Sequence, residues 1–225
     1  KRNVMTKTIS GCLKENKSLL LFISLMLVFR SAVADWNDVP TGSMKPTIVE
    51  GDRILINKLA YDLKLPFSQQ TLIKLTDPER DDIVIFESKV ADKRLVKRVI
   101  GLPGDTISLI NNKLTINRET ANYRVVTQND DYILSEENIA GNSHLIRTKV
   151  QPGATTPSRL ANFREITIPA NFYLMMGDNR DNSADSRVIG LVPRKEIIGR
   201  SKKVAFSLNY QQYLMPRSER FLKDI

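Results

Sequence analysis

Residues 82–100 read DIVIFESKVADKRLVKRVI, and this stretch decides the fold. Two short runs rich in β-branched residues, 82–86 and 95–100, are separated by a charged segment, a pattern that predicts two strands joined by a turn. Helical periodicity is not sustained anywhere after residue 34. We therefore predict a mainly β fold. Further strands of the same kind are expected at residues 53–57, 106–110, 113–117, 172–176, 188–192 and 203–206.

The N-terminal part of the chain has a different character. Residues 19–29 (LLLFISLMLVF) form an apolar run that only Ser24 interrupts, and basic residues precede it. A basic head, a short apolar core and Ala32-Val33-Ala34 together describe a cleavable secretory signal, whereas a spanning helix usually needs about 20 apolar residues. We nevertheless expect an uncleaved anchor at residues 18–34. The positive-inside rule then predicts a cytoplasmic basic tail at residues 1–17, with the rest of the chain exported.

Charge and cysteine content narrow the possible functions. The 225-residue chain is 41% hydrophobic, which is typical of a globular protein rather than a disordered one. Its net charge of +9 is concentrated at the two ends, since residues 18–193 contain 21 basic and 21 acidic groups. Basic ends around a neutral middle favour contact with membrane lipid over nucleic-acid binding. The only cysteine, Cys12, excludes an intramolecular disulfide and a cysteine-based metal cluster.

Residues 111–169 are more polar than their surroundings and contain Asn-Asn, Asn-Asp and Gln-Pro-Gly turn signals. We interpret them as a smaller domain inserted into a main β domain formed by residues 35–110 and 170–225. The insertion contains no candidate chemistry. His144, the only histidine, lies within it and is expected at the surface.

Two separate segments contain candidate reactive residues. Ser43 lies in residues 40–47 (PTGSMKPT), where prolines on both sides stiffen the backbone and favour an exposed hydroxyl; a serine in such a stretch is more often a simple turn residue. Lys97 lies in a predicted strand whose alternation places it on the same face as Leu95 and Val99. Burial there would lower the pKa of the amine and let it act as a base. The alternative is an edge-strand lysine that prevents strand pairing.

A third segment, residues 177–187 (GDNRDNSADSR), is a dense polar loop. The spacing of its Asp and Asn residues suggests a calcium site. However, it lacks the closing glutamate and the glycine placement of an EF-hand, and it carries two arginines of its own. Ion pairing within the loop is the favoured interpretation.

The serine segment (TGSMKPT), the lysine segment at residues 97–105 (KRVIGLPGD) and the polar loop occur in an order that closely resembles bacterial type I signal peptidases. The resemblance extends from the apolar segment to about residue 206. It implies a β-barrel-like catalytic domain at residues 35–110 and 170–225. It also implies a membrane-bound serine endopeptidase that removes signal peptides from exported preproteins after A-x-A-type sites. No metal and no organic cofactor is implied.

The resemblance also assigns roles to individual residues. Ser43 is implied to be the nucleophile and Lys97 the general base, a known variant of the catalytic triad. The hydroxyl of Thr41, where many members have serine, and the N–H of Ser43 are implied to bind the oxyanion. Asp81 stands where glycine is common in the family. Other implied roles are orientation of the lysine amine by Ser183, bracing of the site by Asp178, Arg180, Asp185 and Arg187, and small apolar substrate pockets lined by Val39, Met44, Ile48, Leu95 and Val96.

The implied location is the bacterial inner membrane, with a single span, a cytoplasmic N-terminus and the catalytic domain on the other side. The expected partners are preprotein signal peptides, membrane lipid and the secretion translocon. Three alternatives remain. A self-cleaving repressor-type peptidase is disfavoured by the apolar N-terminus, whereas a specialised pilin-maturing or conjugation-linked peptidase is hard to separate by sequence. The third is a non-enzymatic exported adhesin or scaffold.

Overall fold

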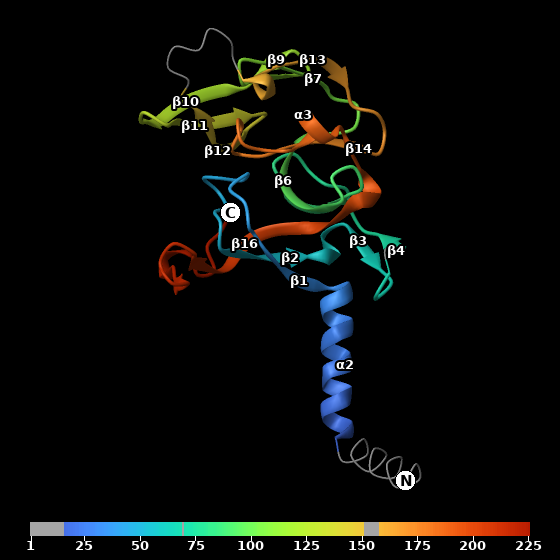
Figure 1. Ribbon diagram of the computed structural model, residues 1–225. Coiled ribbons are helices and arrows are strands. Elements are labelled where there is room, and N and C mark those ends of the chain that lie inside the picture. Colours follow the sequence, from blue (N-terminus) through green and yellow to red (C-terminus); the bar gives the residue numbers. More distant parts are fainter. Residues whose placement is uncertain (1–15, 69, 151–157) are drawn as a thin grey trace.

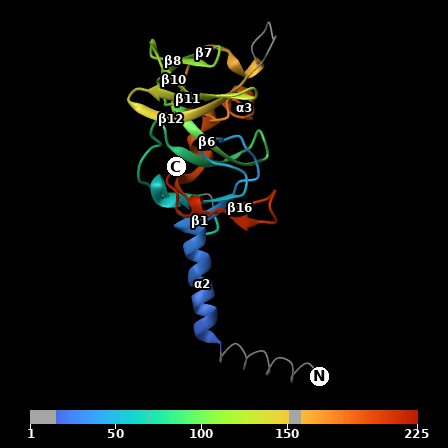
Figure 2. The same cartoon turned by 90° about the vertical axis from the view of Figure 1, so that its left-hand side faces the viewer.

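The computed structural model describes residues 16–68, 70–150 and 158–225. A single long helix, α2 (Lys17–Ala32), projects from one end of a body built from β-sheets (Figures 1 and 2). The predicted mainly β fold is confirmed. Cys12, most of the expected basic tail and the Gln-Pro-Gly turn at residues 151–153 lie outside the described residues.

The largest sheet has eight strands, which pair in the order β1-β2-β16-β5-β6-β14-β15, with β17 paired to β16. All of these pairings are antiparallel. The strands are β1 (Ala34–Asp38), β2 (Asp52–Asn57), β5 (Ile83–Ser88), β6 (Lys93–Gly101), β14 (Phe172–Met176), β15 (Val192–Pro193), β16 (Ile197–Asn209) and β17 (Met215–Pro216).

Two further sheets lie at the end of the body opposite α2 (Figure 1). One has the order β13-β7-β8-β9 and the other β10-β11-β12, while β3 and β4 form a separate hairpin. Because β7 pairs with β8 and β13, residues 106–110 belong to the outer sheets rather than to the largest one. The strands are β3 (Asp62–Lys64), β4 (Thr71–Lys74), β7 (Thr106–Ile110), β8 (Lys113–Ile116), β9 (Glu119–Thr120), β10 (Asn122–Gln128), β11 (Tyr132–Ile139), β12 (Asn142–Lys149) and β13 (Phe163–Thr167).

The hydrophobic core explains why residues 83–86 are apolar without alternation. Ile83 and Ile85 pack into one buried cluster, whereas Val84 and Phe86 pack into another. Successive side chains of a strand point to opposite faces, so β5 is covered on both sides and needs apolar residues at every position. This strand and its partner β6 form the centre of the largest sheet.

The prediction of a strand at residues 188–192 is wrong for its first residues. Residues 186–189 form the short helix α3 (Ser186–Ile189), and β15 begins only at Val192. The side chain of Asp185 accepts a hydrogen bond from the N–H of Arg187 at 3.2 Å, which caps the helix start. Gly190 then ends the helix with a φ of +83°, a conformation that favours glycine. The helix cap therefore determines the local structure here, although the β-branched residues favour a strand.

The 3₁₀ turns are η1 (Lys58–Ala60), η2 (Arg159–Ala161), η3 (Arg194–Glu196) and η4 (Ser218–Arg220).

Helix α2 contains 16 residues, and the large apolar side chains of residues 19–29 are all exposed. Its C-terminal end leads directly into β1. Within residues 16–68, 70–150 and 158–225, no helix combines the length and the apolar character required to cross a membrane.

We predict that Ile85→Ala lowers the free energy of unfolding by about 2–5 kcal/mol, because Ile85 is fully buried and the truncation leaves a cavity. Val90→Ala is the control, since Val90 is 75% exposed and its truncation should change stability by less than about 0.5 kcal/mol. Denaturant unfolding of both full-length variants in detergent measures the difference. Equal effects of the two substitutions would contradict the placement of β5 in the core.

Candidate active site

Ser43 lies in the loop between β1 and β2, and residues 178 and 179 hold that loop in place. The N–H of Asn179 donates to the carbonyl of Ser43 at 3.1 Å, and its side-chain amide donates to the carbonyl of Gly42 at 2.9 Å. Four residues further on, the hydroxyl of Thr47 donates to Asp178 at 2.5 Å. The serine therefore sits on a backbone that is fixed from both sides.

Lys97 lies on β6 and is almost completely buried, with 2% of its surface exposed. Its Nζ is 2.6 Å from the Oγ of Ser43 and 2.9 Å from the carbonyl oxygen of Val96. Burial lowers the pKa of the amine to about 8, although Asp185 and Asp178 pull it upward. The predicted burial of Lys97 is confirmed, and near neutral pH a fraction of this amine is unprotonated and can accept a proton.

The carboxylates near Lys97 are each held by an arginine. Asp178 accepts two hydrogen bonds from Arg98, at 2.9 and 2.7 Å, and Asp185 accepts two from Arg187, at 2.8 and 2.7 Å. Burial alone would raise the pKa of both aspartates, but the arginines keep each pKa below its usual value. Both carboxylates therefore stay ionised, and each is paired with its arginine rather than with Lys97.

Pairing within the polar loop was expected, and it holds only for Asp185 with Arg187. Asp178 instead pairs with Arg98 on β6, and the fully buried Arg180 forms two contacts with Glu137 on β11. The loop also runs beside β12, where the N–H of Arg147 donates to the carbonyl of Asp178 at 2.8 Å. The loop is thus tied to the largest sheet on one side and to the outer sheets on the other.

Gly177 marks the closest approach between the polar loop and the serine loop. A Cβ added there would lie 2.4 Å from the carbonyl oxygen of Ser43 and 2.3 Å from the Oγ of Ser183. Ser183 is itself buried, with 4% exposed, but no hydrogen bond joins it to Lys97 in the part of the chain that the structure describes. Its role in orienting the lysine stays a prediction.

A cavity of about 460 Å³ opens beside the serine and the lysine. Thr41 is exposed at its edge, and in the described residues the N–H of Ser43 donates to no acceptor, so both remain free to bind an oxyanion. Of the residues predicted to line substrate pockets, Ile48 does not reach this cavity but is fully buried in the core behind it. The other four, Val39, Met44, Leu95 and Val96, lie on its wall.

Within the described residues, no strand pairs with one edge of β6 where it borders the cavity. Residues 93–98 pair with β5 on one side, but β14 pairs with β6 only from Arg98 onward. The stretch from Lys93 to Lys97 therefore has a strand partner on one side only, and on the side of the cavity the described residues provide no second strand, although the carbonyl of Val96 accepts from the Lys97 Nζ. Such an edge can pair with an extended peptide.

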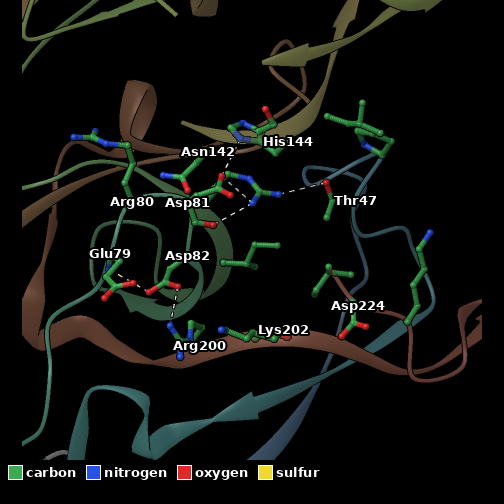
Figure 3. Close-up of a pocket in the computed structure, with 18 residues that line it drawn as sticks. Thr47, Glu79, Arg80, Asp81, Asp82, Asn142, His144, Arg200, Lys202 and Asp224 are labelled. Carbon is green, nitrogen blue, oxygen red and sulfur yellow. Dashed lines mark hydrogen bonds and ion pairs between the residues drawn. The ribbon is translucent and has the colours of Figure 1, made fainter. Parts of the chain in front are cut away.

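The prediction that His144 lies at the surface is wrong. It is buried, and its Nδ1 is 2.8 Å from Asp81 while its Nε2 is 3.1 Å from Glu137. Although burial opposes this, the two carboxylates raise the pKa of the imidazole. Figure 3 shows Asp81 beside His144. Arg98 also donates to the carboxylate of Asp81 at 3.2 Å and lies 3.5 Å from the hydroxyl of Thr47. Sequence reasoning missed this cluster because its members lie on three separate segments.

Asp81 occupies a left-handed backbone conformation, with a φ of +78°. Such a conformation costs a residue other than glycine up to about 1–3 kcal/mol. Its side chain is engaged by Arg98 at 3.2 Å in addition to His144. An aspartate at this position therefore makes ionic contacts that a glycine could not make.

The family described as "Signal peptidase, peptidase S26" matches residues 13–206, most of the chain. The chain belongs to this family. It is 36% identical to a signal peptidase I of Pseudomonas aeruginosa over 207 residues, covering 85% of this chain and 71% of the relative. It is 33% identical to a signal peptidase I of Rickettsia typhi, covering 90% of this chain and 83% of the relative. It is accordingly a serine peptidase of the signal peptidase I class.

A crystal structure of a signal peptidase I from Enterococcus faecalis V583 was also found. It is 24% identical in sequence, with a TM-score of 0.36, and the match covers 56% of this chain and 98% of the other.

We predict that kcat/KM rises with pH and levels off above about 8, the pKa of Lys97, because only the neutral amine can accept a proton. The measurement is a pH profile of peptide cleavage by the 225-residue chain in detergent. Val188→Ala, at an exposed position of α3, should give the same profile as the unmodified protein. A rate that is flat between pH 6 and 9, or that falls across that range, would contradict this assignment of the base.

We predict that Gly177→Ala lowers kcat by about 10²-fold, because the added methyl group displaces the carbonyl of Ser43 and with it the alignment of Oγ and Lys97. Steady-state kinetics with a signal-junction peptide measure this effect. The unfolding temperature is measured in parallel to show that the variant is folded. An alanine variant that cleaves at an unchanged rate would mean that the close approach is not needed.

Proposed function

We propose that this enzyme is a membrane-bound endopeptidase that removes N-terminal signal peptides from exported preproteins after A-x-A-type sites. In this proposal Ser43 is the nucleophile and Lys97 is the general base. The observation that carries it is the 2.6 Å contact between Ser43 Oγ and a buried amine whose pKa lies at about 8. A hydroxyl becomes a useful nucleophile only when a positioned base removes its proton.

The reaction begins when neutral Lys97 takes the proton of Ser43 and Oγ attacks the scissile carbonyl carbon. The carbonyl oxygen becomes an oxyanion, which the N–H of Ser43 and the hydroxyl of Thr41 stabilise. The Lys97 ammonium then donates its proton to the leaving amine, and an acyl-enzyme ester remains on Ser43. Lys97 next deprotonates a water molecule that hydrolyses the ester and restores Ser43.

The other predicted site residues act by fixing this geometry. Asp178 and Arg98 hold the segment that binds Ser43, and Asp185 with Arg187 fixes the turn that places Ser183 next to Gly177. Arg180, through Glu137, fastens the loop to the outer sheet. In this role Ser183 orients the Lys97 amine once substrate has entered.

The preference for small residues follows from the wall of the cavity. Extended substrate pairs with the free edge of β6, so alternate side chains of the peptide face the wall. Val39, Met44, Leu95 and Val96 make that wall apolar and shallow, which favours alanine one and three residues before the cut. Ile48 contributes from behind by packing in the same buried cluster as Met44 and Val96.

The proposal also places α2 in the bacterial inner membrane as a single-span anchor, with residues 1–17 cytoplasmic and the β body on the opposite side. All the large apolar side chains of residues 19–29 are exposed, and water is a poor solvent for such a surface. In this assignment residues 35–110 and 170–225 form a barrel-like catalytic domain with residues 111–169 inserted. Membrane lipid and the secretion translocon are its neighbours.

We predict that Ser43→Ala and Lys97→Ala each lower kcat/KM by at least about 10³-fold on a peptide that spans an A-x-A junction. Lys113→Ala, at an exposed position on β8, is the matched control and should retain full activity. Mass spectrometry of the products locates the cut. Cleavage away from the second alanine would refute the proposed specificity, and an active Lys97→Ala variant would refute the assigned base.

A further inference from the structure

A second cavity, of about 220 Å³, lies where α2 meets the β body. Its lining contains three cationic side chains and two hydroxyl groups, and no carboxylate. The residues that line it are Ser31, Ala32, Lys58, Lys64, Phe67, Ser68, Arg94 and Ile198. We call it the helix-base pocket.

The positive charge of the helix-base pocket is only partly compensated. Lys58 lies 3.4 Å from Asp35, which also accepts a 2.8 Å hydrogen bond from Arg30, so one carboxylate serves two cations. The Lys58 ammonium also donates to the carbonyls of Arg30 and Ser31, and Arg94 pairs with Glu87 at 2.9 Å. In the described residues Lys64 forms no ion pair, and its Nζ donates to the carbonyl of Ile197 at 2.9 Å. Burial lowers the pKa of Lys64, which means that its ammonium is poorly solvated. An anion in the pocket would relieve this cost.

Among the residues that the structure describes, neither hydroxyl of the pocket donates a hydrogen bond. Ser31 Oγ accepts the N–H of Phe67 at 2.7 Å, and Ser68 Oγ accepts the N–H of Gln70 at 3.1 Å. Each hydroxyl hydrogen is thereby left for another acceptor. The Lys64 ammonium, the N–H groups of Arg94 that do not contact Glu87 and the two hydroxyls form a donor set that suits a phosphate group, and Lys58 adds positive charge beside them.

The surroundings of the pocket are apolar. Exposed side chains of α2 lie on one side, and Figure 1 shows the β3–β4 hairpin beside the end of this helix. This hairpin region exposes Phe67 at 73%, Leu72 at 57% and Ile73 at 54%. Exposed apolar groups next to clustered cations are typical of the interface between lipid chains and headgroups.

We infer that the helix-base pocket binds the phosphate group of an anionic phospholipid next to α2. This inference rests on the membrane anchoring in the proposed function and adds a specific lipid site to it. Arg94 lines both this pocket and the catalytic cavity. A bound lipid would therefore sit beside the catalytic cavity and help to fix the β body against the membrane.

Trp36 provides a direct test, because it is the only tryptophan in the chain, lies on β1 just after α2 and is 52% exposed. The full chain is placed in phosphatidylcholine vesicles that contain a small fraction of brominated phosphatidylglycerol or brominated phosphatidylcholine. Bromine quenches tryptophan only at short range, so the ratio of the two quenching curves gives the local preference for the anionic lipid. We expect a preference that Lys64→Gln reduces about fivefold, since one cation near a membrane contributes about 1 kcal/mol.

Lys113→Gln removes the same charge from the distant β8 strand and should leave the preference unchanged, while Lys64→Arg should retain it. An unchanged preference in Lys64→Gln, or an equal loss in Lys113→Gln, would overturn the inference. Inorganic phosphate added in excess over the brominated lipid should not restore the fluorescence. Restoration would show a site for soluble phosphate and overturn the lipid assignment.

The outcomes also separate this inference from the proposal on which it rests. Quenching by brominated phosphatidylcholine without any preference for the anionic lipid would overturn the helix-base site alone. No quenching by either lipid would overturn the membrane anchoring and this inference together. Cleavage of the junction peptide in detergent is independent of both results and reports on the catalytic assignment.

Discussion

The burial of one amine against one hydroxyl is the constraint on which the rest of the structure depends. An ammonium group is expensive to remove from water, and this expense is what brings the pKa of Lys97 down to about 8. A carboxylate paired directly with the amine would keep it protonated and useless as a base. The two nearby carboxylates, Asp178 and Asp185, are instead occupied by Arg98 and Arg187. By pairing with these carboxylates, the arginines limit how far Asp178 and Asp185 raise the pKa of Lys97, although neither arginine contacts the lysine.

The outer sheets contribute to the candidate active site although neither Ser43 nor Lys97 lies on them. Glu137 of β11 holds Arg180, and the backbone of Arg147 on β12 exchanges hydrogen bonds with residues 178 and 180. Buried ion pairs of this kind are weak evidence for stability, because desolvation offsets their attraction. Their directional contacts do fix geometry. We therefore regard the inserted segment as part of the support that keeps Gly177 against the serine loop.

The sequence predicted those parts of the fold that local pattern determines. β5 and β6 were predicted from their runs of β-branched residues, which strands buried on both faces need. The burial of Lys97 was predicted because strand alternation places it on the same face as Leu95 and Val99. The cluster of the half-buried Asp81 with the buried Glu137 and His144 was missed, because polar residues in a polar segment look like surface residues until tertiary contacts bring them together. α3 was missed because the side chain of Asp185 caps a helix start in a segment whose β-branched residues favour a strand. The roles of the site residues came from resemblance to a family, since spacing alone left Ser43 a possible turn residue.

The position of the cleft relative to α2 follows from strand pairing rather than from chain length. β1 begins two residues after α2 ends, and its full length pairs with β2, so the segment that leads to Ser43 cannot extend or swing freely. Under the proposed anchoring, the serine therefore stays at a fixed height above the bilayer. A substrate tethered by its own signal helix would meet the same restriction. Under the proposed function, selection of the bond to be cut then depends on two independent factors, the proposed small pockets on the cavity wall and the distance from the membrane at which they are held.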